Sequence, residues 1–125
     1  MQTNWNDYQP IYRQLRERVI ALILDGVLDE GEALPSVRNV SSEFRVNPIT
    51  VSKAYQTLVE DNLVEKKRGL GMFVQSGAKE MLLESEKKKF LEQEWPAIIS
   101  RIHRLGLSTA ELLSLQKPDM PTGGA

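Results

Sequence analysis

The sequence has no cysteine, a single histidine and no long apolar run among its 125 residues. Without cysteine the chain can form neither a disulfide framework nor a thiolate metal site. No apolar stretch approaches the ~20 residues that a membrane-spanning helix needs. The N-terminal residues also lack the basic region followed by an apolar one that marks a signal peptide. We therefore expect a cytoplasmic protein that carries no metal and no other cofactor.

Residues with the chemistry of enzymes are equally scarce. No glycine-rich phosphate-binding loop lies between a predicted strand and a predicted helix. The lone histidine, His103, follows Ile102 in a C-terminal helical segment, where a surface or interface role is more common than a catalytic one. We expect no catalytic residues and no enzymatic activity.

Charge is nearly balanced over the whole chain but is unevenly distributed along it. The formal net charge is −1. Residues 36–76 contain six basic and four acidic residues, whereas residues 1–35 contain three and six. A local basic face matters more for contact with phosphate than the charge of the whole chain. The middle of the chain is therefore the candidate for binding nucleic acid.

The segment from Asn47 to Glu60 predicts an amphipathic helix in this basic region. Asn47 is a typical N-cap, and Pro48 suits the first helical position. Apolar residues recur at helical spacing from Val51 to Val59 and form one face. The opposite face has no acidic residue before Glu60, which suits a helix that enters the major groove of DNA. That face carries Ile49, Ser52, Lys53, Gln56 and Thr57.

Two more helices are predicted before this one. Ser36 is a good N-cap for a short helix over residues 36–44, and residues 45–47 form a tight connection. Two helices joined by such a turn, the second with a polar outer face, form a helix-turn-helix. Residues 10–25 predict the other helix. Its expected buried face consists of Ile11, Leu15, Val19, Leu22 and Ile23.

A basic β-hairpin is predicted after the helix-turn-helix. Residues 63–67 and 72–75 predict two strands, and Gly69 and Gly71 give the turn the positive φ that a tight hairpin needs. A hairpin at this place is the wing of a winged helix. Its cations can contact the DNA backbone, or they can be the solvated residues of an ordinary edge strand. They are Lys66, Lys67 and Arg68.

The last third of the chain predicts helices with an apolar seam of the kind that pairs helices. Pro96 predicts a kink or a break within the seam, and Ser108 begins a capping box for a last short helix. We expect residues 77–117 to hold a homodimer and residues 118–125 to be a disordered tail. The alternative is that the seam folds back on the first helix of its own chain. The candidate dimerisation residues are Leu91, Trp95, Ile98, Ile102, Leu105, Leu112 and Leu115.

Four linked stretches resemble the DNA-binding domain of GntR-family bacterial transcription regulators. They are PIYRQL at 10–15, LPSVR at 34–38, VNPITVSKAYQTL at 46–58 and LVEKKRGLGMFV at 63–74. The form NPITVSKAY, with a short C-terminal part that closes with LGLSTAELL, is similar to the small YtrA-like branch. Members of that branch lack a large effector-binding domain, dimerise through a short helical tail and commonly repress operons that encode ABC transporters.

The resemblance implies a mainly α fold with a small β-hairpin, in which residues 1–76 form a winged helix-turn-helix DNA-binding domain. It also implies a homodimeric, sequence-specific regulator of transcription that binds an inverted-repeat operator in double-stranded DNA. A winged helix can also serve as a protein-interaction module without DNA affinity, and this is the alternative. The basic charge of residues 36–76 favours DNA. Neither the operator sequence nor an effector follows from these residues.

Carried over by position, the resemblance places Arg38 at the DNA backbone or groove and Arg68 with Gly69 at the wing tip. On the recognition helix it places Thr50, Ser52 and Lys53. Many relatives have an arginine near the position of Pro48. The groups left there are the hydroxyls of Thr50 and Ser52, the ammonium of Lys53 and the amide of Gln56. The amide suits adenine, but an exposed glutamine on a helix is also common as a solvated side chain. The candidate DNA-contacting residues are Arg38, Pro48, Ile49, Thr50, Ser52, Lys53, Gln56, Lys66, Lys67, Arg68 and Gly69.

Overall fold

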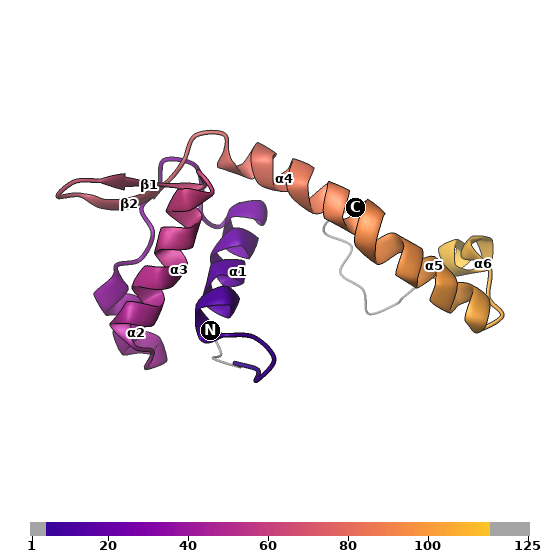
Figure 1. The fold of residues 1–125 in the computed structure, drawn as a ribbon. Helices are drawn as coiled ribbons and strands as arrows, with labels where there is room; N and C mark the ends of the chain where they lie inside the picture. The colour runs from indigo at the N-terminus through magenta and orange to yellow at the C-terminus, as the bar shows by residue number, and fades with distance from the viewer. Residues whose placement is uncertain (1–4, 116–125) are drawn as a thin grey trace. The chain divides into compact units, whose positions relative to one another are not determined.

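The computed structural model describes residues 5–115. Its elements divide into two compact units, between Glu84 and Ser85. This division lies beyond residue 76 because Ala78 and Leu82, in the first turns of α4, are buried in the core of the first unit. In chain order (Figure 1) the elements are α1 (Ile11–Leu24), α2 (Val37–Phe44), α3 (Pro48–Glu60), β1 (Val64–Lys67), β2 (Gly71–Val74), α4 (Ala78–Lys89), the π-helical turn η1 (Phe90–Glu94), α5 (Trp95–Arg104) and α6 (Thr109–Ser114).

Helix α3 is the centre of the first unit. It lies beside α1, and α2 packs against it next to its first turns (Figure 1). The apolar face predicted for α3 is confirmed, since Val51, Ala54 and Leu58 are fully buried and Tyr55 is nearly so. Burial of one large apolar side chain stabilises the fold by about 1.5–3 kcal/mol. In the predicted face of α1, Leu15, Val19 and Ile23 are buried, Leu22 is half-buried and Ile11 is exposed.

Side-chain caps determine where α2 and α3 begin. The Ser36 hydroxyl accepts a hydrogen bond from the Asn39 N–H at 3.0 Å, and the Asn47 side chain accepts one from the Ile49 N–H at 2.8 Å. Both caps satisfy N–H groups that a helix start leaves without an intrahelical partner. Helix α2 ends at Arg45, whose φ of 53° is left-handed and turns the chain toward α3. The predicted helix-turn-helix is therefore confirmed.

Two sets of backbone hydrogen bonds hold the wing, one on each side of β2. Strands β1 and β2 pair antiparallel, with Val64 opposite Val74. The loop before α2 pairs with the other side of β2, through hydrogen bonds from the Gly31 N–H to the Val74 carbonyl and from the Leu34 N–H to the Met72 carbonyl, both at 2.8 Å. The sequence predicts only a loop at residues 31–34. This pairing holds the base of the wing against the segment that leads into α2.

In the second unit, η1 and α5 form one helical run that is interrupted at Pro96. Proline lacks an N–H and its ring crowds the carbonyl four residues earlier. The chain widens into a π-helical turn just before it, and the Trp95 N–H bonds to the Phe90 carbonyl five residues back. The break predicted at Pro96 thus takes the form of a π turn. Ser108 caps α6 by accepting from the Glu111 N–H at 3.1 Å.

Within residues 5–115 no helix has the length and hydropathy needed to cross a membrane. The tail predicted for residues 118–125 lies outside the described residues.

Candidate nucleic-acid interface

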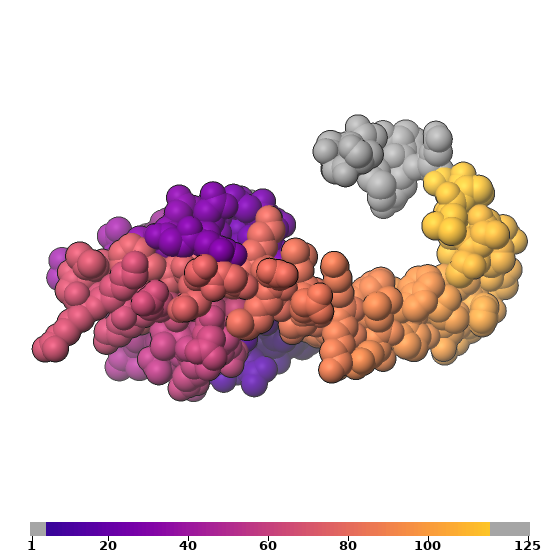
Figure 2. Space-filling model, turned by 90° about the horizontal axis from the view of Figure 1, so that it is seen from above, coloured from indigo at the N-terminus to yellow at the C-terminus, as the bar shows by residue number. Residues whose placement is uncertain are grey.

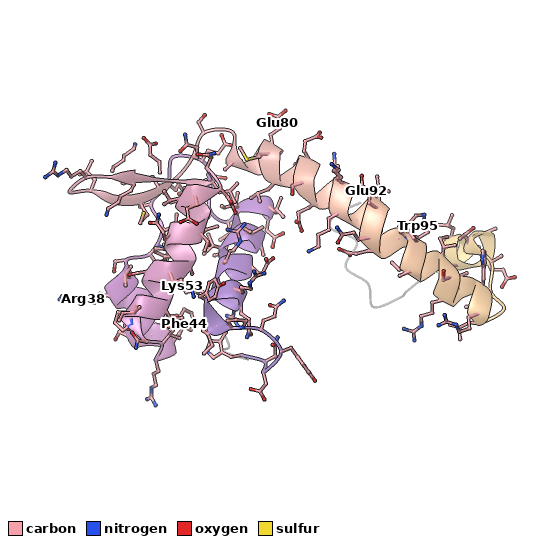
Figure 3. All side chains as sticks on the ribbon, in the orientation of Figure 1. Arg38, Phe44, Lys53, Glu80, Glu92 and Trp95 are labelled. Carbon is pink, nitrogen blue, oxygen red and sulfur yellow. The ribbon has the colours of Figure 1, made fainter. Side chains whose placement is uncertain are left out.

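The residues predicted to contact DNA lie on the surface of the first unit, and only Thr50 among them is half-buried. They come from α2, from the first turns of α3 and from the wing. Figure 3 shows Arg38 on α2, on the side away from α1, whereas Lys53 lies between α3 and α1. Cationic side chains therefore lie on both flanks of α3.

The first turn of α3 has no free backbone N–H. Pro48 has none to offer, and the Asn47 side chain accepts from Ile49. The Asn47 carbonyl accepts from Thr50 at 2.9 Å and from Val51 at 3.2 Å. Free N–H groups at a helix start often bind phosphate. Because they are occupied here, α3 has only side chains with which to contact DNA.

The open face of α3 combines one apolar side chain with short polar ones. Ile49 is 75% exposed, and Ser52 and Gln56 are exposed beside it. In the major groove an apolar side chain suits the methyl group of thymine, a hydroxyl suits several base edges and a glutamine amide suits adenine. This face therefore has groups that can distinguish base pairs.

Two residues predicted for the open face lie against α1. The Thr57 hydroxyl accepts from Arg16 at 3.1 Å and donates to the Ala54 carbonyl at 2.7 Å, so its prediction as an outer residue is wrong. The Lys53 ammonium lies 4.2 Å from the centre of the Tyr12 ring. Tyr12 is not among the residues that the sequence predicts for the interface. Its aromatic side chain, one residue beyond the predicted buried face of α1, is the signal that could have found it.

The wing carries its three cations on exposed side chains, and in the space-filling view its tip projects from the first unit (Figure 2). The Leu70 N–H bonds to the Lys67 carbonyl at 2.9 Å and closes the turn. Gly69 has a φ of 77° and Gly71 a φ of 121°, so the predicted need for positive φ is confirmed. The Lys67 ammonium lies 4.8 Å from the centre of the Phe73 ring.

The second unit has an apolar groove of about 510 Å³ between α5 and α6. It brings together Trp95, Ile98, Ile102 and Leu112 of the predicted dimerisation residues, but not Leu91, Leu105 or Leu115, which are exposed elsewhere. It also includes Ile99 and Leu113, which are not among the predicted dimerisation residues.

Phe90 is a further apolar residue of the second unit that the predicted seam omits. Its ring centre lies 6.2 Å from that of Trp95. The π turn brings Phe90 and Trp95, which are five residues apart, onto one face. The predicted seam follows the ordinary helical spacing of three and four residues and therefore omits Phe90.

These features define the first unit as a winged helix-turn-helix domain with a basic surface around α3, the second helix of the helix-turn-helix. Residues 11–74 match the family model "Bacterial regulatory proteins, gntR family". The chain belongs to the GntR family of transcriptional regulators, and its mostly helical fold with a two-stranded hairpin agrees with solved members of that family.

Three similar proteins locate the chain within the family. HTH-type transcriptional repressor YtrA of Bacillus subtilis (strain 168) is 34% identical over 103 residues, which cover 82% of this chain and 78% of that protein. A GntR family transcriptional regulator from Listeria monocytogenes has a TM-score of 0.72 at 28% identity, with 88% of this chain and 95% of that chain covered. AraR(DBD) in complex with operator ORX1 has a TM-score of 0.52 at 27% identity, with 59% and 90% covered.

Proposed function

We propose that the chain is a homodimeric repressor that binds an inverted-repeat operator in double-stranded DNA. The observation that carries the proposal is the face of α3, which presents Ile49, Ser52 and Gln56 to solvent with cations on both flanks. The similarity to a transcriptional repressor and to a domain solved with its operator supports it. By resemblance to the YtrA-like branch, the target is an operon that encodes a transporter. The protein acts in the cytoplasm and has no enzymatic activity.

In this proposal the residues divide between reading bases and holding phosphates. The side chains of Ile49, Ser52 and Gln56 read base edges, with Thr50 and Pro48 beside them at the start of the helix. Phosphate contacts fix the position of a protein on the duplex but carry no sequence information. Those contacts come from Arg38, Lys53, Lys66, Lys67 and Arg68, with the Gly69 backbone at the wing tip.

Binding of the operator is tested by a salt series. The operator is first selected from genomic fragments with the wild-type chain, and its dissociation constant is then measured by fluorescence anisotropy. Lys53→Ala, and separately Arg68→Ala, are expected to weaken binding. Each makes the dependence of log K on log salt less steep by about one for each phosphate that the variant no longer neutralises. Lys79→Ala is the matched control, because Lys79 is exposed and lies next to Gly26 at the other end of α1.

Wild-type behaviour of both variants over the whole salt range would show that the proposed surface is wrong. A wild-type chain without salt-dependent DNA binding would favour the protein-interaction module. A winged helix can act in that way because the fold alone does not determine the function.

The homodimer is proposed to form through the groove between α5 and α6. Trp95 and Ile98 are about 40% exposed, and a contiguous apolar patch of this kind commonly marks an interface. Two-fold proteins read two half-sites with two recognition helices, so a dimer also fits an inverted repeat. The predicted residues Leu91, Leu105 and Leu115 lie outside the groove lining and would belong to the rim of the interface.

Dimerisation is tested by sedimentation at micromolar concentration. Ile98→Asp is expected to give a monomer, because the dimer would bury an unpaired charge. His103→Asp is the control, since His103 is exposed and lies outside the groove lining. An unchanged dimer mass for Ile98→Asp would place the interface elsewhere. A monomer that still binds the full operator tightly would remove the need for a dimer.

A further inference from the structure

Two cationic side chains, one from α1 and one from α3, lie at Tyr12. Tyr12 belongs to α1, which is not one of the two helices of the helix-turn-helix. The Lys53 ammonium of α3 lies 4.2 Å from the centre of the Tyr12 ring. Arg13, the next residue of α1, lines the same shallow pocket as Tyr12. A hydrogen bond from the Arg13 guanidinium lowers the pKa of the Tyr12 hydroxyl, and the charges of Arg13 and Lys53 act in the same direction.

Three acidic residues also belong to this pocket, and one of them, Glu17, lies one turn after Arg13 on α1. The pocket, of about 270 Å³, is also lined by Glu17, Glu60 and Asp61. Asp61 is already paired with Arg16 at 2.6 Å. Within residues 5–115 no ion pair engages Arg13 or Lys53. Arg13 and Lys53 thus carry two positive charges that no acidic partner within bonding distance, among the described residues, neutralises.

The position of the cluster relates it to the recognition helix. Helices α1 and α3 lie side by side and run in the same direction (Figure 1), with Tyr12 next to Lys53 and Arg16 next to Thr57 one turn later. The cluster therefore lies on the flank of the first turns of α3. When those turns occupy a major groove, the phosphates of a bordering strand pass along such a flank.

We propose that Tyr12, Arg13 and Lys53 together bind one phosphate of the DNA backbone, which makes α1 part of the DNA interface. The inference rests on the proposed function. A phosphate diester matches the cluster because it accepts hydrogen bonds from a guanidinium, an ammonium and a phenol at once. Tyr12 is a positioning residue as well, because its ring attracts the Lys53 ammonium and restricts that long side chain.

The experiment replaces single phosphates of the selected operator by neutral methylphosphonates and measures binding by the full-length chain. Wild type is expected to lose roughly tenfold in affinity, equivalent to ~1.4 kcal/mol, at one phosphate in each half-site. Arg13→Ala and Lys53→Ala are expected to lose less than about twofold at that same phosphate, because these variants no longer bind it. Arg68→Ala is the control and keeps the full loss there.

Two substitutions of Tyr12 separate positioning from packing. Tyr12→Phe keeps the ring, so Lys53→Ala should still weaken binding in that background. Tyr12→Leu removes the ring, and Lys53→Ala should then have a smaller effect. Thermal midpoints of all variants check that each is folded. An equal effect of Lys53→Ala in both backgrounds would overturn the positioning role.

The proposal and the proposed function fail in different ways. If Arg13→Ala stays as sensitive as wild type to every methylphosphonate, the phosphate site is refuted while operator binding through α3 stands. If wild type binds DNA without any salt dependence, both are refuted. Loss of sensitivity at one shared phosphate in Arg13→Ala and Lys53→Ala supports the site.

Discussion

Replacing Tyr55 by phenylalanine removes a single hydroxyl from the core of the winged helix. The side chain is 1% exposed, and its hydroxyl donates to the Pro35 carbonyl at 2.6 Å. Pro35 directly precedes Ser36, the N-cap of α2. This one hydrogen bond therefore ties the recognition helix to the segment from which α2 and Arg38 start.

At neutral pH the variant loses this hydrogen bond and leaves the Pro35 carbonyl without its donor. A net loss of about 1–2 kcal/mol in the free energy of unfolding is expected for such a change. The packing of the ring stays the same, so no cavity contributes. The slope of the denaturation curve should not change, because the surface exposed on unfolding is nearly the same.

At high pH the same hydroxyl gives a second, independent signal. Burial raises the pKa of Tyr55 to about 12, from the value of 10.0 expected in the unfolded chain. The folded state then holds this proton more tightly than the unfolded state does. The resulting stability is fully present below pH 10 and is lost as the pH rises toward about 12. Its size is at most about 3 kcal/mol, since the pKa rises from 10.0 to about 12 and one pKa unit corresponds to ~1.4 kcal/mol.

Urea denaturation of wild type and Tyr55→Phe, at neutral pH and at several values between 10 and 12, measures both effects. All other ionisable groups are common to the two proteins, so the difference between them isolates Tyr55. The absence of cysteine means that high pH cannot reshuffle disulfides. The difference should be largest at neutral pH and shrink above pH 10. A difference that does not vary with pH would refute the view that a buried, hydrogen-bonded phenol stabilises this fold.

Two further predictions concern the wing turn and the contact between α1 and α3. Gly71→Ala should destabilise the protein by more than ~1 kcal/mol, because a φ of 121° disfavours any side chain. Gly69→Asn should be nearly neutral, because asparagine tolerates a φ of 77°. Equal thermal midpoints for the two variants would contradict this. Arg16→Met should cost only about 0.5–1 kcal/mol, because the Asp61 carboxylate of its ion pair is 54% exposed, although the Arg16 side chain is only 22% exposed. A coupling energy above ~2 kcal/mol in a double-mutant cycle with Asp61→Asn would show that Arg16 and Asp61 are held far more rigidly.

Local sequence signals were sufficient for the elements that carry the candidate interface. The beginning of α3 depends on Asn47 and Pro48, and its buried face depends on apolar spacing within the helix. The wing turn depends on two glycines that reach positive φ. Each signal acts over a few neighbouring residues and needs no knowledge of the rest of the chain. The helix-turn-helix, the wing and the exposed face of α3, except at Lys53 and Thr57, could therefore be predicted from the sequence.

Contacts between distant residues were decided only by the tertiary structure. Lys53 lies on Tyr12 because α1 packs beside α3, and residues 31–34 pair with β2 because the chain returns to the wing. Phe90 reaches Trp95 because the chain forms a π turn just before Pro96. In each case the partner is determined by how whole elements pack. Helical spacing assigns a residue to a face, but the neighbour that covers that face depends on the rest of the fold.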